Sequence, residues 1–241
     1  MFINYAHRGA SEYAPENTLS SFCLGLEMGA NGIETDIQLT KDGVPVLFHD
    51  DSLKRVTGVD AALCEKTLAE LYEIDFGAHI RGEKYRGEQI VKFSDFMRYF
   101  AKRPISLALE LKGPDTEKFA LDEVARHSCR GRVVLTSFEL GYLKAVRSLD
   151  PDISAGYLTD DVTPAVLNLL EGLNITQICP KAGFISREKV EYAKSRGFSV
   201  RAWGVADAEL MEKCLSCGVD GMTVNFPDVL SRRVKELGLS L

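Results

Sequence analysis

The sequence predicts a single-domain (β/α)8 barrel, the TIM-barrel fold of the α/β class, over residues 1–241, with a small insertion after the second strand. Three observations lead to this prediction. The chain has 241 residues, close to the roughly 250 typical of such a barrel. Strand-like segments recur along its whole length, and helical patterns lie between most of them. Eight alternating units in a chain of this length favour a closed barrel over an open sheet.

The predicted strands are short runs that are wholly apolar or alternate between apolar and polar residues. Eight of them belong to the barrel: Ile3–Ala6, Gly32–Leu39, Ile105–Leu111, Arg132–Thr136, Ile153–Tyr157, Ile175–Cys179, Ser199–Trp203 and Gly221–Val224. A further run, Val44–Phe48, follows the turn at Asp42 and Gly43. Because Asp-Gly turns connect antiparallel strands, this run is predicted to extend the second strand as a hairpin without adding a ninth unit.

The predicted helices carry apolar residues at intervals of three and four. They cover Thr18–Met28, Thr116–His127, Leu140–Ser148, Pro164–Glu171, Arg187–Ser195, Ala208–Ser216 and Val229–Leu237. Residues 50–89 interrupt the alternation with several glycines, a helix-like segment at Leu68–Tyr72 and a charged run at 81–88. Barrel active sites are built from loops at the C-terminal ends of strands, so an insertion after His49 is predicted to cap the site.

Composition and charge narrow the class of partner. The net charge is −6 and the pI about 5.4, so the protein has no overall positive charge to attract a nucleic-acid backbone. Residues 1–10 lack the basic and apolar stretches of a signal peptide, and no run approaches the roughly 18 apolar residues of a membrane span. We therefore expect a cytoplasmic protein that binds neither nucleic acid nor membrane; the sequence indicates no oligomeric state.

Three carboxylates are predicted to face the barrel interior. The period of two in Gly32–Leu39 places Glu34 and Asp36 on the face opposite the apolar residues, and the same period in Ile105–Lys112 places Glu110 inward. Buried carboxylates are costly unless they are paired or bind a metal. Oxygen ligands favour Mg²⁺ or Ca²⁺. Alternation alone leaves two interpretations open: a divalent-cation site, or a structural network with Lys and Arg inside the barrel.

Two histidines and two positively charged residues lie at the ends of predicted strands. His7 and Arg8 follow the first predicted strand, and His49 ends the hairpin. Histidine can take and give a proton near neutral pH, so the pair allows acid and base roles. Arg8 and Lys112 supply the positive charge that an anionic phosphoryl group requires. For each residue the alternative is structural: a turn or core histidine, or a cation paired with an interior carboxylate.

The order of these residues resembles the glycerophosphodiester phosphodiesterase family. The matching segments are His7–Ala10, Pro15–Thr18, the long stretch Glu34–Asp50 continued by Leu53, Arg55, Thr57 and Gly58, and Leu109–Lys112. The resemblance implies an enzyme with the barrel fold that hydrolyses a small glycerophosphodiester to glycerol 3-phosphate and an alcohol. It also implies a divalent cation, Mg²⁺ or Ca²⁺, held by the three carboxylates. Under the same resemblance His7 and His49 are the acid–base pair, and Arg8 and Lys112 contact the phosphate.

The chain departs from the family pattern in three places, two of them in its second half. Trp203–Ala206 stands where the family usually has Trp-Thr-Val-Asn, and Thr223–Pro227 stands where a Thr-Asp and then a Pro are common. Val91 with Lys92 replaces the usual Pro-Thr. Trp203, the sole tryptophan, is predicted to line the substrate pocket, with strand–helix packing as the alternative. In the first half, Glu16 and Asn17 are interpreted as structural residues of the loop after the first strand, and Asn17 as the cap of the helix that begins at Thr18.

Several alternatives stay open on the sequence. The substrate headgroup and the roles of the two histidines are undetermined, and the nucleophile is either water or a neighbouring substrate hydroxyl that forms a cyclic phosphate. Other diesters, such as a lysophospholipid, a glycerophosphoinositol or a teichoic-acid fragment, fit the same chemistry. A barrel that binds phosphodiesters or metal without turnover is the alternative from a different class.

Overall fold

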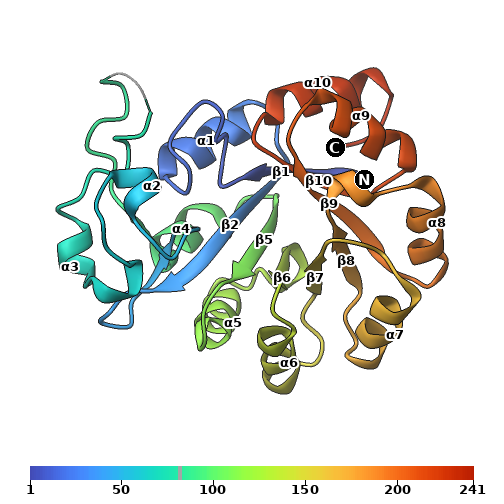
Figure 1. The fold of residues 1–241 in the computed structure, drawn as a ribbon, viewed down its shortest axis with the longest axis horizontal. Coiled ribbons are helices and arrows are strands. Elements are labelled where there is room, and N and C mark those ends of the chain that lie inside the picture. Colours follow the sequence, from blue (N-terminus) through green and yellow to red (C-terminus); the bar gives the residue numbers. More distant parts are fainter. Residues whose placement is uncertain (81–82) are drawn as a thin grey trace.

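A parallel barrel forms the centre of the protein in the computed structural model, which describes residues 1–80 and 83–241 (Figure 1). Its eight strands are β1 (Ile3–His7), β2 (Gly32–Leu39), β5 (Ser106–Leu111), β6 (Val133–Ser137), β7 (Ala155–Thr159), β8 (Gln177–Pro180), β9 (Ser199–Val205) and β10 (Gly221–Val224). Each pairs in parallel with its neighbours, and β1 pairs with both β2 and β10, which closes the barrel. The predicted fold is confirmed.

Helices surround the barrel, and within the described residues one leads from each barrel strand toward the next. They are α1 (Leu19–Glu27), α4 (Phe93–Phe100), α5 (Thr116–Arg126), α6 (Leu140–Leu149), α7 (Pro164–Gly172), α8 (Arg187–Ser195), α9 (Ala208–Cys217) and α10 (Pro227–Glu236). The helix α4 was not predicted from the sequence. Its buried residues Phe93, Phe96, Met97 and Phe100 have helical spacing, but the run is short and rich in aromatic residues with modest helix propensity.

The start of α1 differs from the sequence prediction. Thr18 is the N-cap: its side chain accepts a hydrogen bond from the Ser21 backbone N–H, and the Ser21 hydroxyl accepts one from Thr18 N–H. The prediction that Asn17 caps this helix is wrong. Asn17 has a left-handed backbone, with φ of +57°, which turns its side chain toward the barrel instead.

A hairpin and a small subdomain follow β2. The strand β3 (Pro45–Leu47) is antiparallel to β2, as predicted, and β4 (Val91–Lys92) pairs with β3. Between them lie α2 (Lys54–Thr57), the 3-10 helix η1 (Leu63–Glu65) and α3 (Leu68–Leu71), which share an apolar cluster of their own and form the cyan part of Figure 1. Arg81 and Gly82 of the predicted charged run lie outside the described residues.

The lower part of the barrel interior is filled by side chains. Tyr5, Ala108 and Val134 form an apolar cluster there. Above Tyr5 lies Arg201, which is 2% exposed; its guanidinium is 5.1 Å from the Tyr5 ring centre and donates to the Thr223 hydroxyl at 3.1 Å. This layer fills the barrel beneath the C-terminal ends of the strands, where the active sites of such barrels are built.

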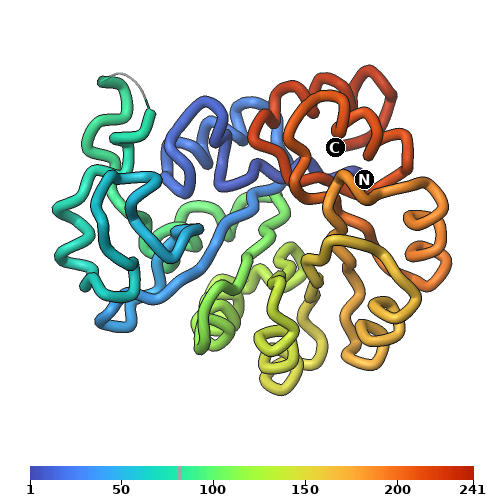
Figure 2. The backbone as a smooth tube through the Cα atoms, viewed as in Figure 1, coloured from blue at the N-terminus to red at the C-terminus, as the bar shows by residue number. Residues whose placement is uncertain are grey.

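The chain begins and ends on the same side of the barrel. Figure 2 shows the two termini close together, and the Phe2 backbone N–H donates to the Ser240 carbonyl at 2.7 Å. Within the described residues, no helix has the length and apolar character needed to cross a bilayer.

Candidate active site

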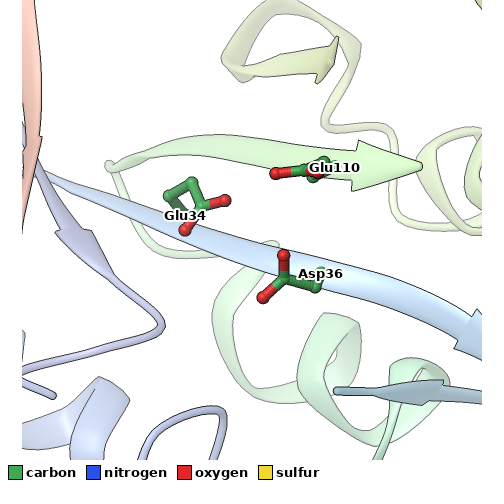
Figure 3. A group of neighbouring side chains, drawn as sticks. All are labelled: Glu34, Asp36 and Glu110. Carbon is green, nitrogen blue, oxygen red and sulfur yellow. The ribbon is translucent and has the colours of Figure 1, made fainter. Parts of the chain in front are cut away.

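Three buried carboxylates face a common space between β2 and β5 (Figure 3). Asp36 stands directly opposite Glu110 in the parallel register, and Glu34 lies two residues earlier on the same face of β2. Oxygen atoms of the three groups lie within 4.8 Å of one another, and none of the residues is more than 7% exposed. The alternation in the two strands thus brings together the residues that the sequence predicted.

The pKa values of the three carboxyl groups are shifted in different directions. Burial, followed by the charges of Asp36 and Glu110, raises the pKa of Glu34 to about 8. Burial and Asp36 raise the pKa of Glu110 to about 7. Burial also opposes ionisation of Asp36, but Arg8 and Lys112 outweigh it and lower the pKa of that carboxyl. Ionisation is therefore favoured at Asp36 and opposed at Glu34 and Glu110.

The carboxylate cluster fits a hard divalent cation. Among the described residues, the buried atoms Glu34 Oε2 and Asp36 Oδ1 have no hydrogen-bond partner. Unsatisfied buried acceptors are rare in folded proteins and call for an unseen partner. Carboxylate oxygens are the donors that Mg²⁺ and Ca²⁺ prefer, and a cation between the three groups would relieve their mutual repulsion. This arrangement is capable of binding such an ion.

Two cations border the cluster. Arg8 Nε lies 3.4 Å from Asp36 Oδ2, and its Nη1 donates to Glu16 Oε1 at 3.0 Å. Lys112 Nζ lies 3.0 Å from Glu110 and 3.7 Å from Asp36. Arg8 has a φ of +55°, at the sharp turn after β1. Arg8 and Lys112 thus place two positive charges beside the carboxylates, where they can contact a bound anion.

His7 ends β1 and points into the site. Its Nδ1 lies 2.6 Å from Asn225 Oδ1, and its Nε2 lies 3.8 Å from Glu34. Because an amide oxygen only accepts hydrogen bonds, Nδ1 carries the hydrogen and Nε2 is left as the acceptor. Burial, and then the charge of Arg8, lowers the pKa of His7 to about 4, so the ring is neutral at physiological pH.

His49 is held differently. Its Nδ1 lies 2.6 Å from a carboxylate oxygen of Asp50. Burial opposes the ionisation of Asp50, yet hydrogen bonds from Arg55 and His49 lower its pKa to about 2. The Gln38 side chain donates to the carbonyls of Phe48 and Asp50 at 2.9 and 3.0 Å, which fixes the loop that carries the histidine. His49 thus has a charged partner where His7 has a neutral one.

Two cavities meet at His49, Glu110 and Phe138. The first, of about 280 Å³, contains His7, Arg8 and Glu34 and has a mostly apolar far wall of Phe138, Leu158 and Trp203. Trp203 packs edge-on against Phe138 with 5.0 Å between ring centres, and its indole N–H donates to the Thr159 carbonyl at 3.0 Å. The second cavity, of about 370 Å³, includes Lys112, Glu139 and Tyr142.

A family comparison accounts for this geometry. The model of the glycerophosphoryl diester phosphodiesterase family matches residues 7–229. The chain belongs to this family. The family and the enzyme class predicted from the sequence are thereby confirmed.

Individual phosphodiesterases of the family resemble the chain over almost its full length. A glycerophosphodiester phosphodiesterase of Caldanaerobacter subterraneus subsp. tengcongensis is 30% identical, over 97% of this chain and 98% of the relative. A phosphodiesterase structure from Oleispira antarctica, in complex with the product sn-glycerol-3-phosphate, has a TM-score of 0.89 and 29% identity, with 97% of this chain and 96% of the other covered. The family fold and this barrel therefore agree in detail.

The structure brings the residues predicted from the sequence together around the carboxylate cluster and the two cavities. Several residues beside them were not predicted. Asn17 donates from Nδ2 to Asp36 Oδ2 at 3.0 Å and accepts from the Thr35 hydroxyl at 2.7 Å, so it orients a cluster carboxylate. Arg201, Phe138 and Leu158 line the first cavity. The family-like segment at Pro15–Thr18 marked Asn17 as notable; no sequence signal singled out the other three.

Proposed function

We propose that this member of the family hydrolyses glycerophosphodiesters to glycerol 3-phosphate and an alcohol, with a divalent cation bound by Glu34, Asp36 and Glu110. The observation that supports the proposal is that three buried carboxylates, Arg8, Lys112 and two histidines lie together where two cavities meet. The structural neighbour from Oleispira antarctica bound to sn-glycerol-3-phosphate supports the same product class.

Arg8 and Lys112 have a role in binding the substrate. Mg²⁺ or Ca²⁺, when bound, would offset negative charge on a phosphoryl oxygen. Arg8 and Lys112, which pair with Asp36 and Glu110, would contact the remaining phosphoryl oxygens and hold the diester in line for attack. The two cavities that meet at His49 give room for the two alcohol arms of a diester.

The partners of the histidines suggest how they divide the proton transfers. His7 is neutral, with Nε2 free to accept, and suits the base that removes a proton from the nucleophile. His49 has the ionised Asp50 against Nδ1, which orients the ring so that Nε2 can deliver a proton to the leaving alcohol. The nucleophile oxygen bonds to phosphorus, the phosphorus–oxygen bond to the leaving alcohol breaks, and the alcohol oxygen receives the proton from His49.

Release of glycerol 3-phosphate from glycerophosphocholine tests this function directly. We expect turnover by the purified protein, loss of turnover after chelation, and recovery when Mg²⁺ or Ca²⁺ is restored. A 2-deoxy analogue distinguishes the nucleophiles, because a cyclic phosphate cannot form without the neighbouring hydroxyl. Turnover that persists undiminished in chelator contradicts the proposed metal dependence, and a panel of diesters that all remain intact contradicts the activity.

The metal-free cluster also predicts a pH dependence of stability. Folding raises the pKa of Glu34 from 4.5 to about 8 and that of Glu110 from 4.5 to about 7. The folded state therefore holds more protons than the unfolded chain, and its stability falls as pH rises through these values. His7, whose pKa is lowered, acts in the opposite sense only below its ordinary value of 6.5. One pKa unit is worth about 1.4 kcal/mol, and each kcal/mol shifts Tm by about 2–4 °C in a protein of this size.

Scanning calorimetry checks this expectation. The Tm of the metal-free protein should be about 3 °C or more lower at pH 8.0 than at pH 6.5. With saturating Mg²⁺ or Ca²⁺ the drop should shrink, because the ion displaces the protons and compensates the carboxylates. A Glu110→Gln variant should show a smaller drop than the wild type without metal. An identical pH profile with and without the ion would be inconsistent with a metal site at this cluster.

A further inference from the structure

Arg55 lies on α2 of the subdomain that follows β3, outside the cavity, and its side chain is 48% exposed. Its guanidinium nevertheless contacts two carboxylates from different loops. Nη1 and Nη2 donate to the two oxygens of Glu16 at 2.7 and 2.8 Å, and Nε donates to Asp50 Oδ2 at 2.5 Å. All three guanidinium nitrogens therefore take part in charge-assisted hydrogen bonds, which are stronger and more directional than neutral ones.

Each of these two acids also contacts a residue of the site. Glu16 Oε1 accepts from Arg8 at 3.0 Å, and Arg8 in turn lies 3.4 Å from Asp36. Asp50 lies 2.6 Å from His49 through its other oxygen. Arg55 thus connects Glu16, which contacts Arg8, with Asp50, which contacts His49.

The geometry of this link depends on a guanidinium. The planar fork presents two parallel N–H groups to Glu16 while Nε points to Asp50, whereas a lysine ammonium offers one point charge. The Glu16 side chain is only 10% exposed and Asp50 24%, so both acids rely on protein partners more than on water. Without Arg55, the side-chain partners that remain among the described residues are Arg8 for Glu16 and His49 for Asp50.

We propose that Arg55 is a positioning residue that holds Arg8 and His49 in one fixed geometry, and so couples the subdomain after β3 to the phosphodiester chemistry. This inference rests on the proposed function. It predicts that the loss of Arg55 affects the rate of the chemical step more than substrate binding, because the groups that touch the substrate remain present but misplaced.

Steady-state kinetics of Arg55 variants test the proposal. Removal of an outer partner of this kind typically costs about 10–100-fold, so Arg55→Met should lower kcat by about that factor while KM changes less than about threefold. Arg55→Lys should have intermediate activity. Added guanidinium ion, at a concentration that does not unfold the protein, should raise kcat of Arg55→Ala and leave the wild type unaffected. Lys54→Met is the matched control, because Lys54 is the neighbouring residue and its ammonium pairs with exposed Asp60 at 3.1 Å, away from the site.

The outcomes separate this proposal from the proposed function. If the wild type hydrolyses no diester, the proposed function fails before the variants are compared. If the wild type is active and Arg55→Met and Arg55→Ala retain its kcat, the positioning role is overturned. A loss of kcat that neither lysine nor guanidinium ion reduces also overturns it. A thermal unfolding curve of each variant shows whether the protein is still folded at the assay temperature, so that a lower kcat can be assigned to folded protein.

Discussion

Asp36→Asn should lower kcat/KM for a glycerophosphodiester by about a thousandfold or more. Asp36 is fully buried and contacts Arg8, Lys112 and Asn17. The amide keeps the shape of the side chain but removes the one carboxylate of the cluster whose pKa is lowered. Under the proposed function the variant loses an ionised metal ligand, and it leaves Arg8 and Lys112 without their shared counter-charge. Each effect alone costs orders of magnitude in rate.

Titration calorimetry with Mg²⁺ and Ca²⁺ should show weakened binding in the same variant. Asp60→Asn is the control, since the Asp60 side chain is 78% exposed and pairs with Lys54 at the surface. We expect this control to match the wild type in rate and in metal affinity. Full activity of Asp36→Asn, with unchanged ion binding, would remove the carboxylate cluster from the mechanism.

Glutamine at either His7 or His49 should lower kcat by about 10²–10⁴-fold, the usual contribution of general acid–base catalysis. Glutamine preserves a hydrogen-bonding side chain but cannot exchange a proton near neutral pH. His127→Gln is the control, because His127 is the C-cap residue that follows α5 and lies 3.2 Å from Glu123 of that helix. Wild-type rates in both active-site variants would contradict the assignment of an acid–base pair.

The leaving group distinguishes the two histidines. A p-nitrophenyl diester releases an anion that needs no proton, so it should restore most of the rate of His49→Gln and little of that of His7→Gln. Stopped assays of glycerophosphocholine and its p-nitrophenyl counterpart, run on both variants, provide the comparison. The opposite pattern of recovery would exchange the proposed roles.

The carboxylate cluster was predictable because it depends on local periodicity. A period of two in β2 and β5 determines which side chains face inward, and parallel pairing places Asp36 beside Glu110. The helix α4 was missed because its short aromatic run carries weak local signals. The role of Asn17 was missed because the left-handed turn of its backbone is a property of the folded loop.

Residues that act through long-range contacts could not be predicted in this way. Arg201 occupies an ordinary inward position of a strand, and only the closed barrel shows that it lies over Tyr5 and lines the cavity. The bonds from Arg55 to Glu16 and Asp50 join segments whose relative placement depends on the fold of the subdomain. The family resemblance indicated that such positions matter but gave no account of what they contact.

The hydrogen bond between His7 and Asn225 joins positions that are 218 residues apart in sequence. A ribosome produces β2 and β5 in the first half of synthesis, but β10, which pairs with β1, emerges near the end. A nascent chain that stops short of Asn225 therefore has the three carboxylates but nothing to fix the proposed base. We expect hydrolytic activity to arise only when the last strand and Asn225 have been synthesised.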